Sequence, residues 1–155
     1  MESTIAIRPF SADDTAHVRD LFVRVNRLLA PPDMKQAFEA YIAASLSEEI
    51  DQIGRYYGER QGGFWVAVES GRVVGMFGLE PSSVEAMELR RMYVDPDARR
   101  GIARKMLSFA EGECRRRNRP RLDLSTSQLQ GAALSLYRNS GYRLVREEIA
   151  IAASN

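Results

Sequence analysis

A turn rich in arginine and glycine separates an apolar, strand-like segment from a helical pattern between residues 86 and 103. The first turn of a helix has backbone N–H groups without intrahelical acceptors, and it carries the positive end of the helix dipole. A glycine at such a turn lets a ligand approach the backbone closely. Anions bind at helix N-termini of this kind, so the segment predicts a site for a diphosphate. The residues expected around it are Arg99, Arg100, Gly101, Ile102, Ala103 and Arg104, with Lys105 adding charge.

A second segment, residues 130–142, predicts a helix that carries Tyr137 near its end, stops at Gly141 and leads into another strand. Together the two segments resemble the GCN5-related N-acetyltransferases, the GNAT family. The acetyl-CoA loop of that family reads Gln/Arg-x-x-Gly-x-Gly/Ala, and residues 98–103 match it except at the first position. Its later helix reads Asn-x-x-Ala-x-x-x-Tyr-x-x-x-Gly-Tyr/Phe, which residues 130–142 match with Gln130 in place of Asn. Residues 122–130 are similar to the camello-like branch of the family.

The resemblance implies that acetyl-CoA is the co-substrate and that the turn at residues 98–104 binds its diphosphate. It also implies that Gln130 and Tyr137 lie at the cofactor. The extended pantetheine arm is expected to pair with main-chain groups at the end of the fourth strand, as an added strand does. Those groups belong to Met92, Tyr93 and Val94.

The reaction implied by the resemblance is N-acetyl transfer, in which an amine attacks the thioester directly while both substrates are bound. A phenol with a pKa of about 10 protonates a thiolate whose conjugate acid has a pKa of about 8.5 only uphill, but as a hydrogen-bond donor it stabilises the developing charge. Tyr137 is the predicted acid, and a tyrosine that serves only the core is the alternative. An ammonium with a pKa of about 10.4 must lose a proton before it attacks, so a carboxylate or a water relay is needed. Glu88 is the predicted base, with Glu80 and Glu85 as alternatives.

Other functional classes would use some of the same sequence features. A non-catalytic acyl-CoA-binding module with a regulatory role would use the same cleft. The basic run at residues 115–121 closes a helix, where the dipole favours cations, and it has no aromatic residues for base stacking, so we expect no nucleic-acid partner. With one cysteine, Cys114, and one histidine, His17, we expect no metal site of the usual kind. Ser125 and Thr126 either face the cleft or simply begin a turn.

The length and charge of the chain set the remaining expectations. Its 155 residues suit one domain, so residues 1–155 are interpreted as a single acetyltransferase domain. The 22 basic and 21 acidic residues nearly cancel, and no global field favours nucleic acid or an acidic membrane. Without a long apolar run or a signal-like start, we expect a cytoplasmic protein with no membrane partner. The acceptor implied is a small-molecule amine or a peptide amine that binds over residues 22–57, and a homodimer is compatible with the sequence.

The elements that must position these residues follow from apolar periodicity. Alternation predicts strands over residues 4–8, 64–69, 72–79, 84–94, 121–125 and 142–151. Helical spacing predicts helices between Ser11 and Pro31, over about 34–57 with a kink near 45–47, from Gly101 to about 118, and over 130–140. A helix connects the strands 84–94 and 121–125, so these two should be parallel. The sequence therefore predicts an α/β fold with a mixed, twisted sheet of about six or seven strands and helices on both faces.

Overall fold

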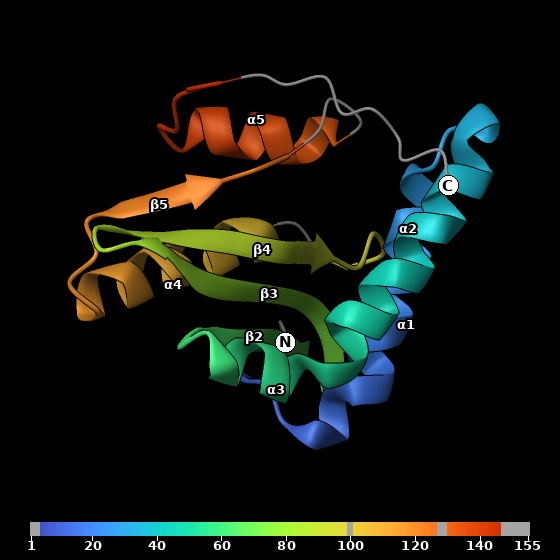
Figure 1. Ribbon diagram of the computed structural model, residues 1–155, viewed down its shortest axis with the longest axis horizontal. Helices are drawn as coiled ribbons and strands as arrows, with labels where there is room; N and C mark the ends of the chain where they lie inside the picture. Colours follow the sequence, from blue (N-terminus) through green and yellow to red (C-terminus); the bar gives the residue numbers. More distant parts are fainter. Residues whose placement is uncertain (1–3, 99–100, 127–129, 147–155) are drawn as a thin grey trace.

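The computed structural model describes residues 4–98, 101–126 and 130–146 (Figure 1). Within these residues one sheet is formed by β1 (Ile5–Pro9), β2 (Gly63–Glu69), β3 (Arg72–Ser83), β4 (Ala86–Val94) and β5 (Arg121–Leu124). The α-helices are α1 (Thr15–Leu29), α2 (Lys35–Glu48), α3 (Ile53–Glu59), α4 (Ile102–Arg116) and α5 (Gly131–Asn139). Three short 3-10 turns, η1 (Ala12–Asp14), η2 (Pro32–Met34) and η3 (Ile50–Gln52), precede α1, α2 and α3.

The sheet is mixed, with the strand order β1-β2-β3-β4-β5. The first four strands are antiparallel to their neighbours, and β5 is parallel to β4. The α/β fold class and the parallel pair on either side of α4 are thus confirmed. The described part of the sheet has five strands, where about six or seven were predicted. Residues 142–146 do not form the start of the strand expected over 142–151, and the rest of that segment lies outside the described residues.

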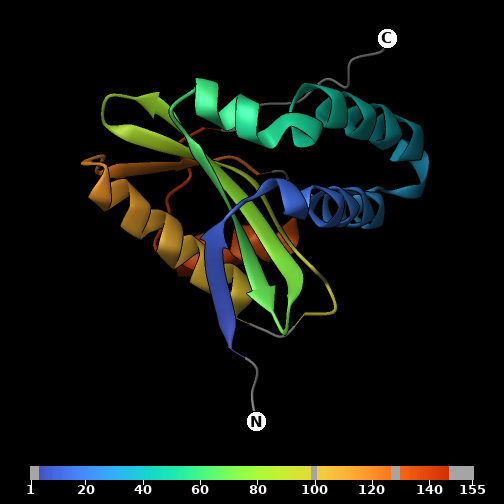
Figure 2. The same ribbon diagram turned by 90° about the horizontal axis from the view of Figure 1, so that it is seen from below.

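Helices cover both faces of the sheet, as predicted (Figures 1 and 2). On one face, which we call the α1–α3 face, buried residues of α1, η3 and α3 pack against Val66 and its neighbours on the sheet. On the other, the α4–α5 face, α4 packs against a cluster that contains Trp65 and Ala67, with Leu136 and Tyr137 of α5 beside it. Successive residues of a strand point to opposite faces, so each strand contributes to both cores.

Prolines and turn residues set the boundaries of these elements. α1 ends at Leu29, shortly before Pro31 and Pro32, which cannot continue a helix. The hairpin between β2 and β3 turns at Ser70 and Gly71, both with positive φ, where the sequence predicted a turn. The long helical pattern of residues 34–57 is interrupted at Glu49, slightly later than the predicted kink, and continues as η3 and α3.

The single cysteine and the single histidine of the chain lie on different helices. Cys114 is buried in the α4–α5 core, and burial raises the pKa of its thiol. His17 is exposed on α1. In residues 4–98, 101–126 and 130–146, no helix is long and apolar enough to cross a membrane. Those same residues contain no group of three or more His, Cys, Asp or Glu placed to hold a metal ion.

Candidate active site at the β4–β5 opening

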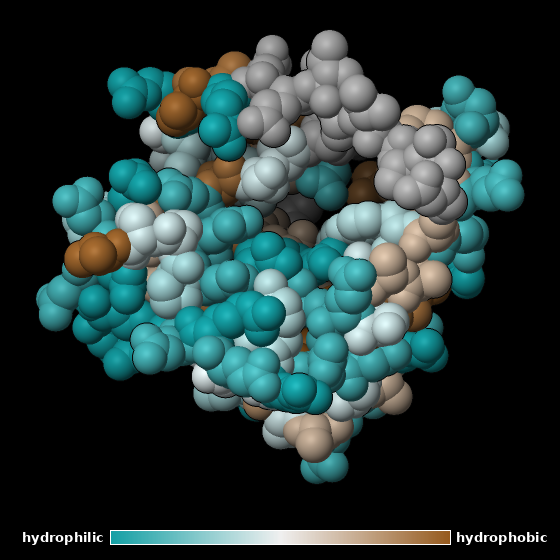
Figure 3. All heavy atoms as spheres, in the orientation of Figure 1, coloured by the Kyte–Doolittle hydropathy of each residue, from teal (hydrophilic) through white to brown (hydrophobic). Residues whose placement is uncertain are grey.

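β4 and β5 pair along only part of their length. Their pairing reaches Leu89 and Leu124, where β5 ends, while β4 continues to Val94. In the described part of the chain, the outer edge of β4 beyond Leu89 therefore has no strand beside it. Figure 1 shows the chain after β5 diverging from β4, and the space-filling view has a hollow between the positions of α5 and β4 (Figure 3). An unpaired strand edge offers N–H and C=O groups to an extended ligand.

The three residues predicted to hold the pantetheine arm lie on this edge. Met92 and Val94 pack their side chains into the α4–α5 core, whereas Tyr93 is buried on the α1–α3 face. Their side chains are occupied by packing, which leaves the main-chain groups for a ligand. The sequence likewise predicted a role for the main-chain groups of these residues and not for their side chains.

α4 begins directly after the turn that follows β4. Gly101 is its N-cap residue, with a φ of +93° that favours glycine. A Cβ atom built there meets no atom of the described residues within 4 Å, so these residues leave space at this position. The first N–H groups of a helix have no intrahelical acceptor, and here they belong to Ile102, Ala103 and Arg104. Arg99 and Arg100, the other predicted members of this site, lie outside the described residues.

Charged side chains before and after this turn contact other elements of the fold. Asp95, buried at the end of β4, pairs with Arg24 at 3.2 Å and with Arg72 at 3.6 Å. Lys105 was expected to add charge at the anion site, but its Nζ donates a hydrogen bond to the carbonyl oxygen of Ile5 at 3.1 Å. The ammonium group of Lys105 thus ties α4 to β1 in this structure.

Tyr137, the predicted acid, lies on α5 at the α4–α5 face. Its ring packs against the core and meets the ring of Tyr142 edge-on, with 6.1 Å between the centroids. Burial raises the pKa of Tyr137 above its ordinary value of 10.0, so the phenol is protonated at neutral pH. Among the described residues nothing accepts a hydrogen bond from its hydroxyl. Tyr137 is therefore a donor without a competing partner there.

The segment between β5 and α5 carries the other polar candidates. Gln130 directly precedes α5, and its Oε1 accepts a hydrogen bond from the hydroxyl of Thr126 at 2.5 Å. Ser125, the residue after β5, is exposed. Thr126 thus has a structural partner in Gln130, whereas Ser125 is accessible to solvent.

β4 contains a bulge at Arg91. Its register with β3 shifts between Met76 and Gly78, and Arg91 has a φ of +52°. A non-glycine residue in this region costs about 1–3 kcal/mol and persists only when its surroundings hold it. The bulge adds one residue to the strand, so Arg90 and Arg91 both direct their side chains to the α1–α3 face.

The two arginines meet a buried carboxylate on that face. Glu49 directly follows α2 and is only 2% exposed. Arg90 Nη2 donates to its Oε1 at 2.5 Å, and Arg91 Nε donates to its Oε2 at 3.0 Å. The Tyr57 hydroxyl donates to the same Oε2 at 2.7 Å. Burial alone would raise the pKa of the Glu49 carboxyl, but the hydrogen bonds that it accepts, above all that from Arg91, hold the pKa below its ordinary value of 4.5. Glu49 is therefore ionised at neutral pH.

Two further carboxylates flank Arg90. Glu80 and Glu88 lie directly opposite each other on β3 and β4. Arg90 Nε lies 3.2 Å from Glu80 Oε2 and its Nη1 lies 3.6 Å from Glu88 Oε1, in ion pairs that offset the repulsion between the carboxylates. The hydroxyl of Tyr56 also donates to Glu80, at 3.1 Å. The side chain of Glu88, the predicted base, is 37% exposed and can be reached by an acceptor. Glu85 lies in the exposed turn between β3 and β4, outside this group.

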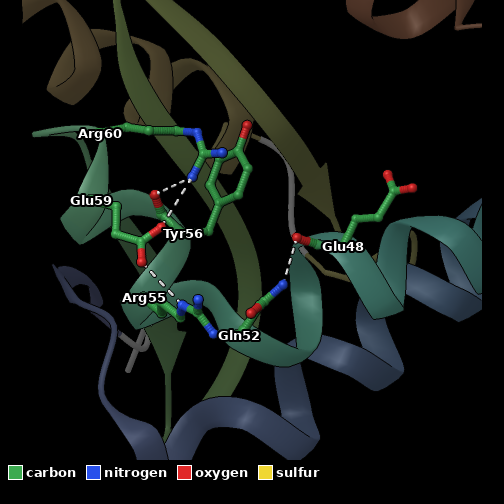
Figure 4. Close-up of a pocket in the computed structure, with 6 residues that line it drawn as sticks. All are labelled: Glu48, Gln52, Arg55, Tyr56, Glu59 and Arg60. Atoms are coloured by element: carbon green, nitrogen blue, oxygen red, sulfur yellow. Dashed lines mark hydrogen bonds and ion pairs between the residues drawn. The ribbon is translucent and has the colours of Figure 1, made fainter.

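A polar depression of about 190 Å³ lies along α3 on the same side of the molecule (Figure 4). The guanidinium of Arg60 stacks on the ring of Tyr56, 3.7 Å from its centroid, and Arg55 pairs with Glu59 at 3.0 Å. Its charges are thus largely paired among themselves. Tyr56 links the depression to Glu80, but the depression is separate from the β4–β5 opening. Its lining consists of Glu48, Gln52, Arg55, Tyr56, Glu59 and Arg60.

Sequence reasoning did not identify the Glu49 cluster. Glu49 lies at the end of a helical pattern and Arg90 and Arg91 lie in a strand, so no local spacing connects them. The bulge that brings both arginines to one face depends on the register between β3 and β4, which is a tertiary property. The only sequence signal was the break in helical periodicity close to Glu49.

Comparisons with known proteins match this chain to one protein family. A family model described as the acetyltransferase (GNAT) domain matches residues 60–144. An N-acetylaspartate synthetase from Danio rerio is 35% identical over 70% of this chain, and N-acetyltransferase family 8 member 3 from Rattus norvegicus is 32% identical over 73% of it. The chain spans only 39% of the first protein and 53% of the second.

A solved structure shares the fold along nearly the whole chain. The paia N-acetyltransferase from Thermoplasma acidophilum, solved in complex with coenzyme A, matches with a TM-score of 0.79 at 18% identity. The match covers 94% of this chain and 93% of that one. At this identity the comparison supports the fold, and the chemistry must be argued from the residues themselves.

Proposed function

The chain belongs to the GNAT acetyltransferase family, as its two sequence segments predicted, and we propose that it is an acetyl-CoA-dependent N-acetyltransferase acting on a primary amine. The observation that carries the proposal is the edge of β4 beyond Leu89, which has no strand beside it among the described residues. Helix α4 starts after the turn that follows this strand, and Tyr137 of α5 packs against the same core as Met92 and Val94. A diphosphate site, an edge for an extended arm and a protonated phenol are the parts that a thioester carrier requires.

In this proposal acetyl-CoA binds with its diphosphate at the start of α4 and its pantetheine arm along β4. The N–H groups of Ile102, Ala103 and Arg104 receive the diphosphate, and the φ of Gly101 and the open space over it support that placement. Arg99 and Arg100 add charge to the same turn, and Gln130 contacts the cofactor from the start of α5. The main-chain groups of residues 92–94 pair with the arm.

Acetyl transfer then requires proton movements at the nitrogen and at the sulfur. The ammonium of the acceptor first gives one proton to Glu88, directly or through water, and the resulting amine attacks the carbonyl carbon of the thioester and forms the new C–N bond. The nitrogen then loses a second proton to water, which leaves a neutral amide. The C–S bond breaks, and the sulfur leaves as a thiolate that takes a hydrogen bond or the proton from the Tyr137 hydroxyl. Because burial raises the pKa of Tyr137, donating a hydrogen bond to the thiolate is easier for this phenol than transferring its proton completely.

The acceptor in this proposal is a small-molecule amine or a peptide amine. It approaches from the α1–α3 face, where Glu88 is exposed and where α1, α2 and α3 lie (Figure 2). We assign residues 1–155 to one domain of this type, which in the longer relatives forms part of a larger chain.

Acetyl-CoA binding tests the first half of the proposal. At about a hundredfold excess over its Kd, a ligand that binds only the folded state adds about 2.7 kcal/mol to the free energy of unfolding. We expect acetyl-CoA and desulfo-CoA to raise the melting temperature by similar amounts, because the phosphates rather than the thioester anchor the ligand. If neither ligand produces a shift, the proposal is wrong. Binding without turnover on any amine would instead identify a non-catalytic acyl-CoA-binding module.

A further inference from the structure

The buried carboxylate of Glu49 connects the end of α2 to the bulge of β4. It accepts hydrogen bonds from Arg90 and Arg91, which are consecutive residues on a strand, and from Tyr57 on α3. Removing one partner of a buried ionic group leaves the other charges without compensation, so such a cluster strongly constrains the elements that it joins. Glu49 thus holds β4 from the α1–α3 face.

The packing around the cluster leaves Tyr57 little freedom. Gly78 of β3 lies opposite Arg90 in the sheet, and a Cβ atom at Gly78 would come within 2.6 Å of the Tyr57 ring. The missing side chain lets Tyr57 lie directly against the strand with its hydroxyl on Glu49. Burial and the charge of Glu49 raise the pKa of Tyr57, so it remains a donor at any physiological pH.

Arg91 is held on its outer side as well. Its Nη1 donates to the hydroxyl of Tyr41 on α2 at 2.6 Å, and its guanidinium lies 5.5 Å from the centroid of the Phe22 ring. Every nitrogen of the Arg91 guanidinium therefore has a partner, because its Nε and Nη2 both contact Glu49. The conformation with a φ of +52° is maintained by these contacts.

The bulge lies within the unpaired edge of β4, directly before the residues predicted to pair with the pantetheine arm. Met92, Tyr93 and Val94 follow Arg91, and the direction of their main-chain groups depends on how the bulge is set. We infer that Glu49 is a positioning residue for the cofactor site. Its contacts on the α1–α3 face fix the bulge, and the bulge orients the edge of β4 that faces the opening toward β5 and receives acetyl-CoA. This inference rests on the proposed function. Because Glu49 lies between α2 and η3, the inference also connects the α1–α3 face, where the acceptor is proposed to bind, to the edge of β4, where acetyl-CoA is proposed to bind.

The test compares two buried carboxylates. Glu49→Gln removes the charge but keeps the shape, and we expect kcat/KM for acetyl-CoA to fall about a hundredfold, as displaced positioning groups cause. Acetyl-CoA Kd should rise at least about tenfold, in line with lost hydrogen bonds to a charged group. The matched control is Asp14→Asn, because Asp14 is also buried and accepts a two-pronged contact from Arg8 at 2.8 Å, but it lies on η1, away from β4. The control should lose thermal stability without a change in Kd.

A gentler variant and a structural readout keep the test decisive if Glu49→Gln folds poorly. Tyr57→Phe removes one donor to Glu49 and leaves the ring over Gly78, so we expect a rise in acetyl-CoA Kd of about two- to tenfold. Amide hydrogen exchange of residues 88–94 should become faster in the Glu49 and Tyr57 variants and stay unchanged in Asp14→Asn.

The outcomes separate the two proposals. If wild-type protein binds acetyl-CoA but the Glu49 and Tyr57 variants match Asp14→Asn in Kd and in hydrogen exchange, the positioning role is wrong and the proposed function stands. If wild-type protein does not bind acetyl-CoA, both proposals are overturned.

Discussion

The sharpest prediction concerns the hydroxyl of Tyr137. Tyr137→Phe removes one oxygen and keeps the ring that packs in the α4–α5 core. Because the hydroxyl has no hydrogen-bond partner among the described residues, no buried acceptor is orphaned, and the free energy of unfolding should change by less than about 1 kcal/mol. If the hydroxyl stabilises the leaving thiolate, turnover should fall about 10²- to 10³-fold, which corresponds to about 2.7–4 kcal/mol of lost transition-state stabilisation.

The neighbouring Tyr142 provides the matched control. Its ring packs edge-on against Tyr137, but its hydroxyl donates to Glu111 Oε2 at 2.6 Å. Tyr142→Phe should therefore lower the free energy of unfolding by about 1–3 kcal/mol, since it leaves a carboxylate oxygen without its donor. Its turnover, measured well below the melting temperature, should remain near normal.

Steady-state kinetics with a responsive amine, together with calorimetric acetyl-CoA binding on the same preparations, distinguishes the two tyrosines. We expect Tyr137→Phe to be stable but slow, with an unchanged acetyl-CoA Kd, and Tyr142→Phe to be less stable but active. Near-normal turnover in Tyr137→Phe would refute the acid assignment and leave Tyr137 as a packing residue.

Three further predictions follow from the same geometry. Gly101→Val should raise acetyl-CoA Kd at least about tenfold, since it strains the turn and fills the space over the helix start. The control Gly71→Val, at another open position with positive φ, should lower the free energy of unfolding by a similar amount and leave acetyl-CoA Kd unchanged. Calorimetry on both variants checks this, and the same Kd in Gly101→Val as in Gly71→Val would mean that the diphosphate site is misplaced. Glu88→Gln should lower kcat by about 10²- to 10⁴-fold with acetyl-CoA Kd unchanged, and unaltered kcat would move the base to Glu80 or to water. The free energy of unfolding should fall as the pH drops below about 4.5. The folded protein holds the pKa of the Glu49 carboxyl below 4.5, so this carboxyl takes up its proton at a higher pH in the unfolded chain than in the folded protein. Equal free energies of unfolding in urea at pH 7 and pH 3 would contradict this.

The local part of the fold could be predicted because its causes are local. Proline after α1, the Ser70–Gly71 turn and the apolar alternation of β2 and β3 each determine backbone geometry within a few residues. The parallel pairing of β5 with β4 followed from the helix between them. The start of α4 next to Gly101 was predicted from the arginine-glycine turn that follows an apolar strand, and the structure adds that Gly101 has a positive φ.

The Glu49 cluster could not be predicted because it depends on register and on long-range packing. The sequence Glu-Leu-Arg-Arg at residues 88–91 reads as ordinary alternation, in which Arg90 and Arg91 would point to opposite faces. Only the bulge brings them together on Glu49, more than 40 residues earlier in the chain. The contact of Lys105 with the Ile5 carbonyl is equally remote in sequence.

The central claim is amine acetylation, and amine-dependent release of free thiol from acetyl-CoA tests it most directly. The panel should contain a diamine, several amino acids and short peptides with free N-termini, and it should include aspartate because one relative is named N-acetylaspartate synthetase. We predict that at least one amine accelerates thiol release with a matching yield of acetylated product, and that Tyr137→Phe abolishes most of this rate. Bound acetyl-CoA without amine-dependent thiol release from any member of the panel would contradict the account.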